Sequence, residues 1–233
     1  MAQPPRFTPR TILFLRALKR HNDRDWFRAR RDEYDTHVRG PMVDVIDRLA
    51  EDLRGFAPEL VAAPKISLFR IYRDTRFSED KSPLKTHAAA VFPHRELGRL
   101  EGAVLYLEVA PTRVMFAGGL HAPASPELRL IRAHVARRYR RLRGIIGTAA
   151  FRRTFGALDG RVMQRVPRGY AKDHPAADLL RRREFLASKE YPAAFAADPK
   201  FYRELLRVFR QIAPLVSFLN EPLVGRVKDP LRP

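Results

Sequence analysis

A chain of 233 residues, 45% of them hydrophobic, is long enough to bury one sizeable core. We expect a single domain over residues 1–233, with flexible tails at 1–7 and 225–233. The chain has no cysteine, which excludes disulfides, thiolate metal sites and thiol catalysis. No apolar run is long enough to span a membrane, and residues 1–10 lack the apolar stretch of a signal peptide, so we expect a cytoplasmic protein.

The formal net charge of +19 is typical of proteins that bind nucleic acids. However, only eight of the 45 basic residues are lysine, a bias that a GC-rich genome produces wherever a basic residue is tolerated. The charge therefore indicates either a phosphate-binding surface or a solvated basic surface.

Apolar residues recur at helical spacing through the first fifty residues. They predict helices over Pro9–Arg20 and Asp25–Arg39, and a third that starts at Gly40–Pro41. The aromatic residues of the second helix, Trp26 and Tyr34 among them, are expected in the core.

The pattern changes in the middle of the chain. It predicts strands over residues 66–72, 88–92, 103–109 and 113–116, with clear alternation in the third strand and a short turn at Pro111–Thr112. Gly118–Gly119 is expected to end the sheet.

Helical patterns return in the second half. They predict helices over residues 125–146, near 176–182, and from Asp198 and Pro214 onward, with an edge strand at 185–189. Helices, then strands, then helices, without β-α-β alternation, predict an α+β fold. We expect a mainly antiparallel sheet over about residues 66–116, packed with N-terminal and C-terminal helices.

The stretch from Arg70 to His87 concentrates charge between two predicted strands. Strand connections are usually short, so a polar stretch of this length is either a solvated loop or a built site. In a chain that uses arginine almost everywhere, the lysines here indicate a need for a compact ammonium, as in phosphate contact. The candidate ligand-binding residues are Arg70, Arg73, Arg76, Asp80, Lys81 and Lys85.

Two interpretations of this stretch stay open. In the first, it binds a small anionic ligand that carries phosphate or carboxylate, either as a binding protein or as an enzyme whose reaction the sequence does not specify. An enzyme would use His87 or Asp74 as proton acceptor. In the second, the charged pairs only hold a long loop against the sheet. No metal is expected, because His87, His94 and His121 are separate and lack a carboxylate at ligand spacing. No cofactor is expected either, since neither a Walker A motif nor a Rossmann fingerprint is present.

Other site candidates lie later in the chain. His121 follows a glycine pair at the end of a predicted strand, and Tyr170 and His174 lie on a loop marked by proline and glycine, where site residues concentrate. An alternative function is nucleic-acid binding through the basic helix over residues 128–153. Aromatic residues are sparse there, so we expect such binding to be weak and non-specific.

The charged stretch also carries a family resemblance. The string Arg70-x-x-Arg-Asp-x-Arg-Phe-Ser-x-Asp-Lys-Ser-Pro-x-Lys-Thr-His87 resembles the signature of the bacterial and fungal family called domain of unknown function 2461. The segments Asn22–Phe27, Gly118–Gly119 and 166–175 resemble its other motifs. Leu84 is a departure, since tyrosine is expected there. The resemblance implies a free-standing domain of about this size and no particular substrate.

Overall fold

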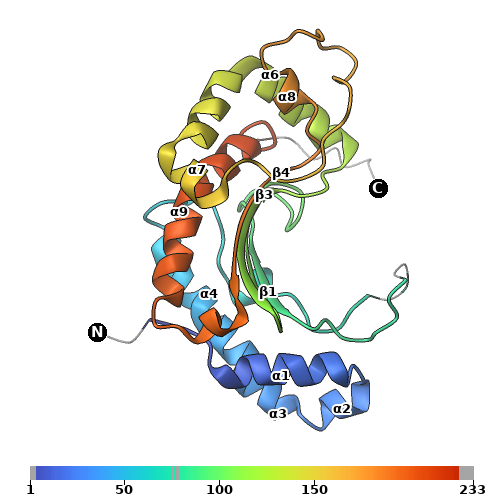
Figure 1. Cartoon of the computed structure of the whole chain (residues 1–233), viewed down its shortest axis with the longest axis vertical. Helices are drawn as coiled ribbons and strands as arrows, with labels where there is room; N and C mark the ends of the chain where they lie inside the picture. Colours follow the sequence, from blue (N-terminus) through green and yellow to red (C-terminus); the bar gives the residue numbers. More distant parts are fainter. Residues whose placement is uncertain (1–3, 75, 77–78, 226–233) are drawn as a thin grey trace.

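A four-stranded antiparallel sheet forms the centre of the computed structural model, which describes residues 4–74, 76 and 79–225 (Figure 1). Its strands, in spatial order, are β1 (Ala88–Phe92), β2 (Val104–Val109), β3 (Arg113–Leu120) and β4 (Phe185–Pro192). Helices precede and follow the central strands, so the predicted α+β class is confirmed. The predicted edge strand at 185–189 exists and continues to Pro192.

The two faces of the sheet have different surroundings. Leu105, Leu107 and Val109 of β2 are fully buried on the face that packs against α9 (Phe201–Asn220), and α4 (Gly40–Leu53) lies on this same side (Figure 1). On the other face, Figure 1 shows no helix over the middle of the sheet in the described part of the chain. We call this second face the open face; its side chains include Tyr106, Glu108, Arg113, Met115, Ser188 and Glu190.

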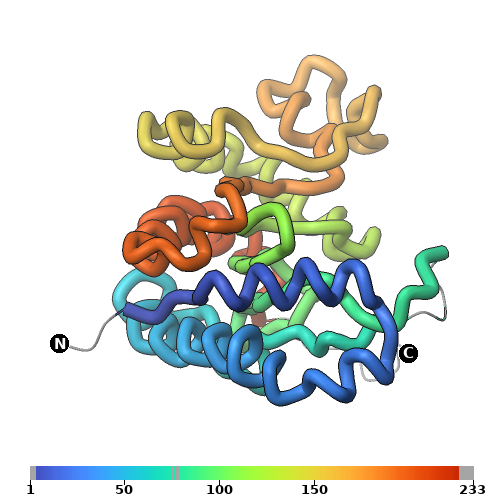
Figure 2. Tube along the Cα trace, turned by 60° about the horizontal axis from the view of Figure 1, so that its bottom comes forward, coloured from blue at the N-terminus to red at the C-terminus, as the bar shows by residue number. Residues whose placement is uncertain are grey.

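The N-terminal helices form a layer at one end of the sheet (Figure 2). They are α1 (Pro9–Arg20), α2 (Arg24–Arg28), α3 (Arg31–Tyr34), the π-helical η1 (Asp35–Arg39) and α4. The helix predicted over 25–39 is therefore broken twice. At the second break, the wider π turn coincides with a tertiary bond: the His37 carbonyl accepts a hydrogen bond of 2.6 Å from the buried Thr11 hydroxyl.

The strand predicted over residues 66–72 is not a regular strand. Its first half is the short helix α5 (Pro64–Ser67), where proline occupies the first turn and the Ser67 hydroxyl accepts from the Ala63 N–H at 3.2 Å. Its second half is extended and forms two isolated bridges, Leu68 with Ala90 of β1 and Tyr72 with Leu84 farther along the chain, and the Phe69 N–H donates to the Ala89 carbonyl at 3.0 Å. The chain thus runs past the edge of β1 and then leaves the sheet.

The C-terminal half contributes α6 (Ser125–Gly147), α7 (Ala149–Phe155), α8 (Ala177–Leu180), the 3-10 helix η2 (Ala193–Ala197) and α9. Two expectations were wrong here. Gly118–Gly119 lies inside β3 and does not end the sheet; Gly119 has a φ of +120°, and a Cβ there would lie 2.0 Å from the Phe185 carbonyl oxygen. Pro214 lies inside α9 and does not start a new helix, because the apolar face of α9 continues across it into the core.

The ends of the chain are only partly described. Of the tails expected at 1–7 and 225–233, residues 1–3 and 226–233 lie outside the described residues. Phe7 is buried, and its ring meets that of Phe201 edge-on at 5.5 Å. No helix in the described ranges is long and apolar enough to cross a membrane.

Candidate functional site

A hairpin arm, the described residues 69–74, 76 and 79–87, carries the predicted ligand-binding residues and projects from the sheet edge (Figure 1). Two backbone hydrogen bonds join its sides: Arg73 N–H donates to the Pro83 carbonyl at 2.9 Å, and Lys85 N–H donates to the Ile71 carbonyl at 2.8 Å. The base of the arm is therefore an ordered two-stranded stem, and the side chains on this stem have defined neighbours.

The N-terminal helices hold this stem in place. The Asn22 side-chain amide donates to the Leu84 carbonyl at 2.9 Å and accepts from the Leu84 N–H at 3.0 Å. The Leu84 side chain is fully buried in the core. The residue that departs from the expected tyrosine thus serves packing in this chain and does not face a ligand.

Two cations lie against one aromatic ring at the base of the arm, and two more arginines are close enough for their charges to act on one of them. The Nζ atom of Lys85 lies 4.9 Å from the centre of the Phe69 ring, and the Arg99 guanidinium lies 4.2 Å from it. Burial lowers the pKa of Lys85, and the charges of Arg70, Arg99 and Arg73 lower it further. We call Arg70, Arg73, Lys85 and Arg99 the cation cluster.

The cation cluster has little negative charge to balance it. In the described ranges, Asp80 is the one carboxylate within ion-pair distance of a member, at 2.7 Å from Arg73. The buried Nε atoms of Arg73 and Arg99 have no hydrogen-bond partner among the residues that the structure describes. Buried polar groups are normally paired, so these two atoms are donors that an acceptor could use.

His87 lies beside the cluster, directly before β1, and is half-buried. Burial lowers its pKa, Glu108 partly opposes this, and the positive charges of Lys85, Arg73 and Arg113 lower it further. A histidine in this setting is neutral at pH 7 and able to accept a proton.

Next to His87, a row of hydrogen-bonded side chains crosses the open face. The nearly buried Glu108 accepts from the Tyr106 hydroxyl at 3.0 Å and from the Arg113 guanidinium at 3.2 Å. Arg113 also pairs with Glu190 of β4 at 3.1 Å. Because both oxygens of Glu108 are engaged, this carboxylate orients its neighbours and is not free to hold a ligand cation.

Other predicted residues of the arm do not join the cluster. Arg76 and Asp74 form an exposed pair at 2.8 Å, and the Arg76 bonds lower the pKa of Asp74 to about 2. Such an acidic group is a poor proton acceptor at pH 7, which favours His87 over Asp74 for that role. Lys81 is exposed on the same outer part of the arm.

The later candidates follow β3 or lie on the segment between α7 and β4, away from the arm in the sequence. His121 is exposed and 4.0 Å from Glu184, a buried carboxylate that accepts from the Arg161 guanidinium at 2.9 Å. The Nδ1 atom of His174 accepts from the Ala176 N–H at 3.0 Å, and Tyr170 packs against the core. These contacts hold the loop between α7 and β4, and none of them reaches the cation cluster.

The basic helix predicted over 128–153 corresponds to α6 and most of α7. Some of its arginines form ion pairs or hydrogen bonds with other residues of the protein. Arg141 pairs with Glu221 at 2.6 Å, Arg143 pairs with Asp178 at 2.8 Å, and the buried Arg132 donates to the Arg182 carbonyl at 3.0 Å. The exposed arginines of α6 that form no ion pair with a described residue are Arg129, Arg137, Arg138 and Arg140.

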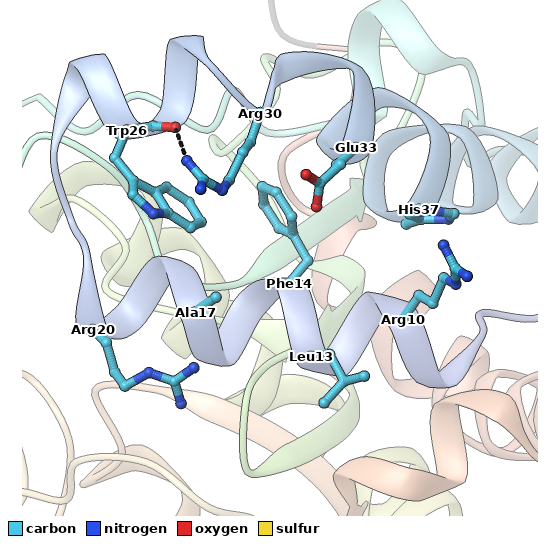
Figure 3. A pocket seen from close by; sticks show the side chains of 9 residues that line it. All are labelled: Arg10, Leu13, Phe14, Ala17, Arg20, Trp26, Arg30, Glu33 and His37. Atoms are coloured by element: carbon cyan, nitrogen blue, oxygen red, sulfur yellow. Dashed lines mark hydrogen bonds between the residues drawn. The ribbon is translucent and has the colours of Figure 1, made fainter.

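A hollow of about 540 Å³ lies between α1 and the α2–η1 helices (Figure 3). Trp26, predicted for the core, lines it half-buried, with the Arg30 guanidinium 4.7 Å from its ring centre. Phe14 forms part of its lining, and Arg10 and His37 stand at one end. Its polar groups are spread along two helices and do not converge on one point, unlike those of the cation cluster.

The protein-family model described as "Conserved hypothetical protein (DUF2461)" matches residues 10–218. The chain belongs to this family. The match includes the arm, the whole sheet and nearly all of α9. No curated protein matches the chain. Phe77 and Ser78 of the arm's DUF2461 signature lie outside the described residues.

In this DUF2461 chain, the N-terminal motif has a structural role. Asn22 holds the arm, and the Asp23 carboxylate caps α2 by accepting from the N–H groups of Asp25 and Trp26 at 2.8 and 2.9 Å. Sequence reasoning missed Arg99 and Phe69 as members of the site. Arg99 comes from the turn before β2, and no local pattern connects it with the arm.

Proposed function

We propose that this DUF2461 protein binds a small molecule bearing a phosphate or carboxylate group at the cation cluster. The observation that carries the proposal is the charge balance. Lys85 and Arg99 share the Phe69 ring, the charges of Arg70 and Arg73 also act on Lys85, and in the described ranges one carboxylate pairs with one member of the cluster. Bringing like charges together costs free energy unless a counter-charge is present, and a bound anion supplies it. Arginine suits this task because its planar donors match phosphate and carboxylate oxygens.

The open face lies next to the cation cluster and would bring the His87 side chain close to a bound ligand. His87 is the residue placed to accept a proton from a ligand held at the cluster, and the cations would stabilise negative charge that forms there. The Tyr106–Glu108–Arg113 row would fix the polar environment of His87. This arrangement fits an enzyme whose substrate is an anion, and it fits a binding protein equally well if no proton moves.

The test is a thermal-shift screen with inorganic phosphate, pyrophosphate and citrate, at constant ionic strength and at two salt concentrations. We expect at least one anion to raise the melting temperature of the wild-type protein. Arg70→Gln should lose most of this shift; Arg70 is exposed and makes no hydrogen bond to a described residue, so its loss should not unfold the protein. Arg129→Gln on α6 removes the same charge elsewhere and should respond like wild type. Equal responses in all three proteins would refute the site.

A further inference from the structure

The cation cluster contains one lysine among three arginines. This chain uses lysine for only eight of its 45 basic residues, so arginine would be the expected fourth cation. Arginine and lysine differ in one chemical respect that matters here: a guanidinium stays protonated, whereas a lysine amine can lose its proton and act as a nucleophile. The surroundings of the Lys85 amine decide which of its two forms is favoured.

Two features of these surroundings favour the neutral amine. Nζ is partly buried near three guanidinium groups that lower its pKa, and no carboxylate of the described residues lies within 4.0 Å of it. The face of Phe69, whose centre is 4.9 Å from Nζ, attracts a cation and offsets part of this effect. Desolvation and neighbouring cations both disfavour an ammonium ion, and they are the two means by which proteins activate a lysine for attack on a carbonyl. The stem bond from Lys85 N–H to Ile71 fixes the backbone from which the amine projects.

We propose that Lys85 forms an imine with an anionic carbonyl compound, a 2-oxo acid or a phosphorylated aldehyde, held by the arginines of the cation cluster. The inference rests on the proposed function, because those arginines must first bind the carboxylate or phosphate. It adds the class of ligand: a molecule with a carbonyl carbon close to its anionic group. Lys85 and Arg99 lie over the same Phe69 ring, and this closeness favours a ligand of that kind.

The chemistry needs no oxidant, reductant or metal. The amine lone pair attacks the carbonyl carbon, and the C=O π electrons move to oxygen, which takes up a proton. The nitrogen of the resulting carbinolamine loses a proton; the hydroxyl then leaves as water after a second proton transfer, and a C=N bond forms. His87 lies two residues after Lys85, and the two charges influence each other, so His87 is placed to carry these protons.

The experiment is reductive trapping. Wild-type protein is incubated with pyruvate, or with pyridoxal 5′-phosphate as the phosphorylated aldehyde, in the presence of borohydride, and the adducts are located by peptide mass mapping. We expect the adduct mainly on Lys85, and competition by inorganic phosphate. Acetone, a ketone without an anionic group, should give little adduct. Lys85→Arg keeps the positive charge but removes the nucleophile, and should reduce trapping at least tenfold. Lys65→Arg, at an exposed lysine of α5, should leave trapping unchanged.

The outcomes separate the two proposals. Label spread evenly over the exposed lysines, or label unaffected by Lys85→Arg, would overturn the inference. If anions stabilise the protein and Lys85 remains unlabelled, the inference fails while anion binding stands. If anions give no stabilisation and Lys85 is not labelled, both fail.

Discussion

The side chain of Asn22 and the backbone of Leu84 are joined by a reciprocal pair of hydrogen bonds, 2.9 Å from the amide to the carbonyl and 3.0 Å from the N–H to the amide oxygen. This pair connects two segments more than sixty residues apart in the chain. It makes the geometry of the arm depend on the N-terminal helices, and through the arm it sets the position of Lys85.

Asn22→Ala should therefore loosen the arm. Losing both bonds leaves two backbone groups of Leu84 unsatisfied, at a cost of about 1–3 kcal/mol in the free energy of unfolding. Urea unfolding measures this cost, and the thermal shift caused by pyrophosphate should shrink in the same variant. Asp25→Ala, on the exposed surface of α2, is the control, and we expect a change within about 0.5 kcal/mol. An Asn22→Ala protein as stable and as responsive as this control would show that the clamp is unimportant.

The contribution of Glu184 to the free energy of unfolding should depend on pH. Hydrogen bonds from Arg161 lower the pKa of this buried carboxyl below that of an ordinary glutamate. The stabilisation is therefore complete above the unfolded pKa of about 4.3 and is lost as pH falls through the lower folded value. Glu184→Gln should cost about 1–3 kcal/mol at pH 7, and the difference from wild type should shrink below about pH 4. Urea unfolding across this range checks it; a difference independent of pH would contradict it.

His87 should be neutral in the free protein at pH 7. Its lowered pKa means that protonation is harder in the folded than in the unfolded state, so its contribution to stability falls as pH drops below about 6.5. His134 has a lowered pKa as well and will add to this effect, so the imidazole signals must be assigned with a His87→Gln variant. NMR titration should give a His87 midpoint below 6.5 that rises when phosphate is added. A midpoint unchanged by phosphate would separate His87 from the anion site.

Nucleic-acid affinity, if present, should be weak and non-specific. Tyr139 is the one aromatic ring of Phe, Tyr or Trp type on α6, too few for bases to stack on, and Arg141 and Arg143 are paired within the protein. If about five arginines met phosphates, log affinity would fall with log salt at a slope of about −4 to −5, with a dissociation constant of about 10⁻⁴ to 10⁻⁶ M at physiological salt. Fluorescence anisotropy with several DNA and RNA oligonucleotides measures both. Nanomolar binding to one sequence would contradict this expectation.

The fold class followed from local patterns because alternation in 103–109 and the helical spacing on either side are strong signals. The strand predicted over 66–72 was wrong because the residues there are of types common in strands. Pro64 and the Ser67 hydroxyl instead favour a helical turn, which composition does not reveal. The prediction that Gly118–Gly119 ends the sheet was wrong. Glycine often marks the end of a strand, but here the missing side chain of Gly119 allows β4 to approach closely.

Only part of the candidate site could be predicted from the sequence. The arm could be located because its charges are contiguous. Arg99 and Phe69 could not be assigned to it, since their meeting depends on how the chain packs along β1. The alternation of Tyr106 and Glu108 was readable, but that their face of the sheet stays open is a tertiary property.

The most direct test of the central claim is isothermal titration of pyrophosphate into wild type, Arg70→Gln and Arg129→Gln. Loss of one charge-assisted hydrogen bond costs about 1.5–3 kcal/mol, so Arg70→Gln should bind at least tenfold more weakly, while Arg129→Gln matches wild type. If both variants bind pyrophosphate as wild type does, or if wild type does not bind it or any other anion that shifts its melting temperature, the cation cluster is not an anion site.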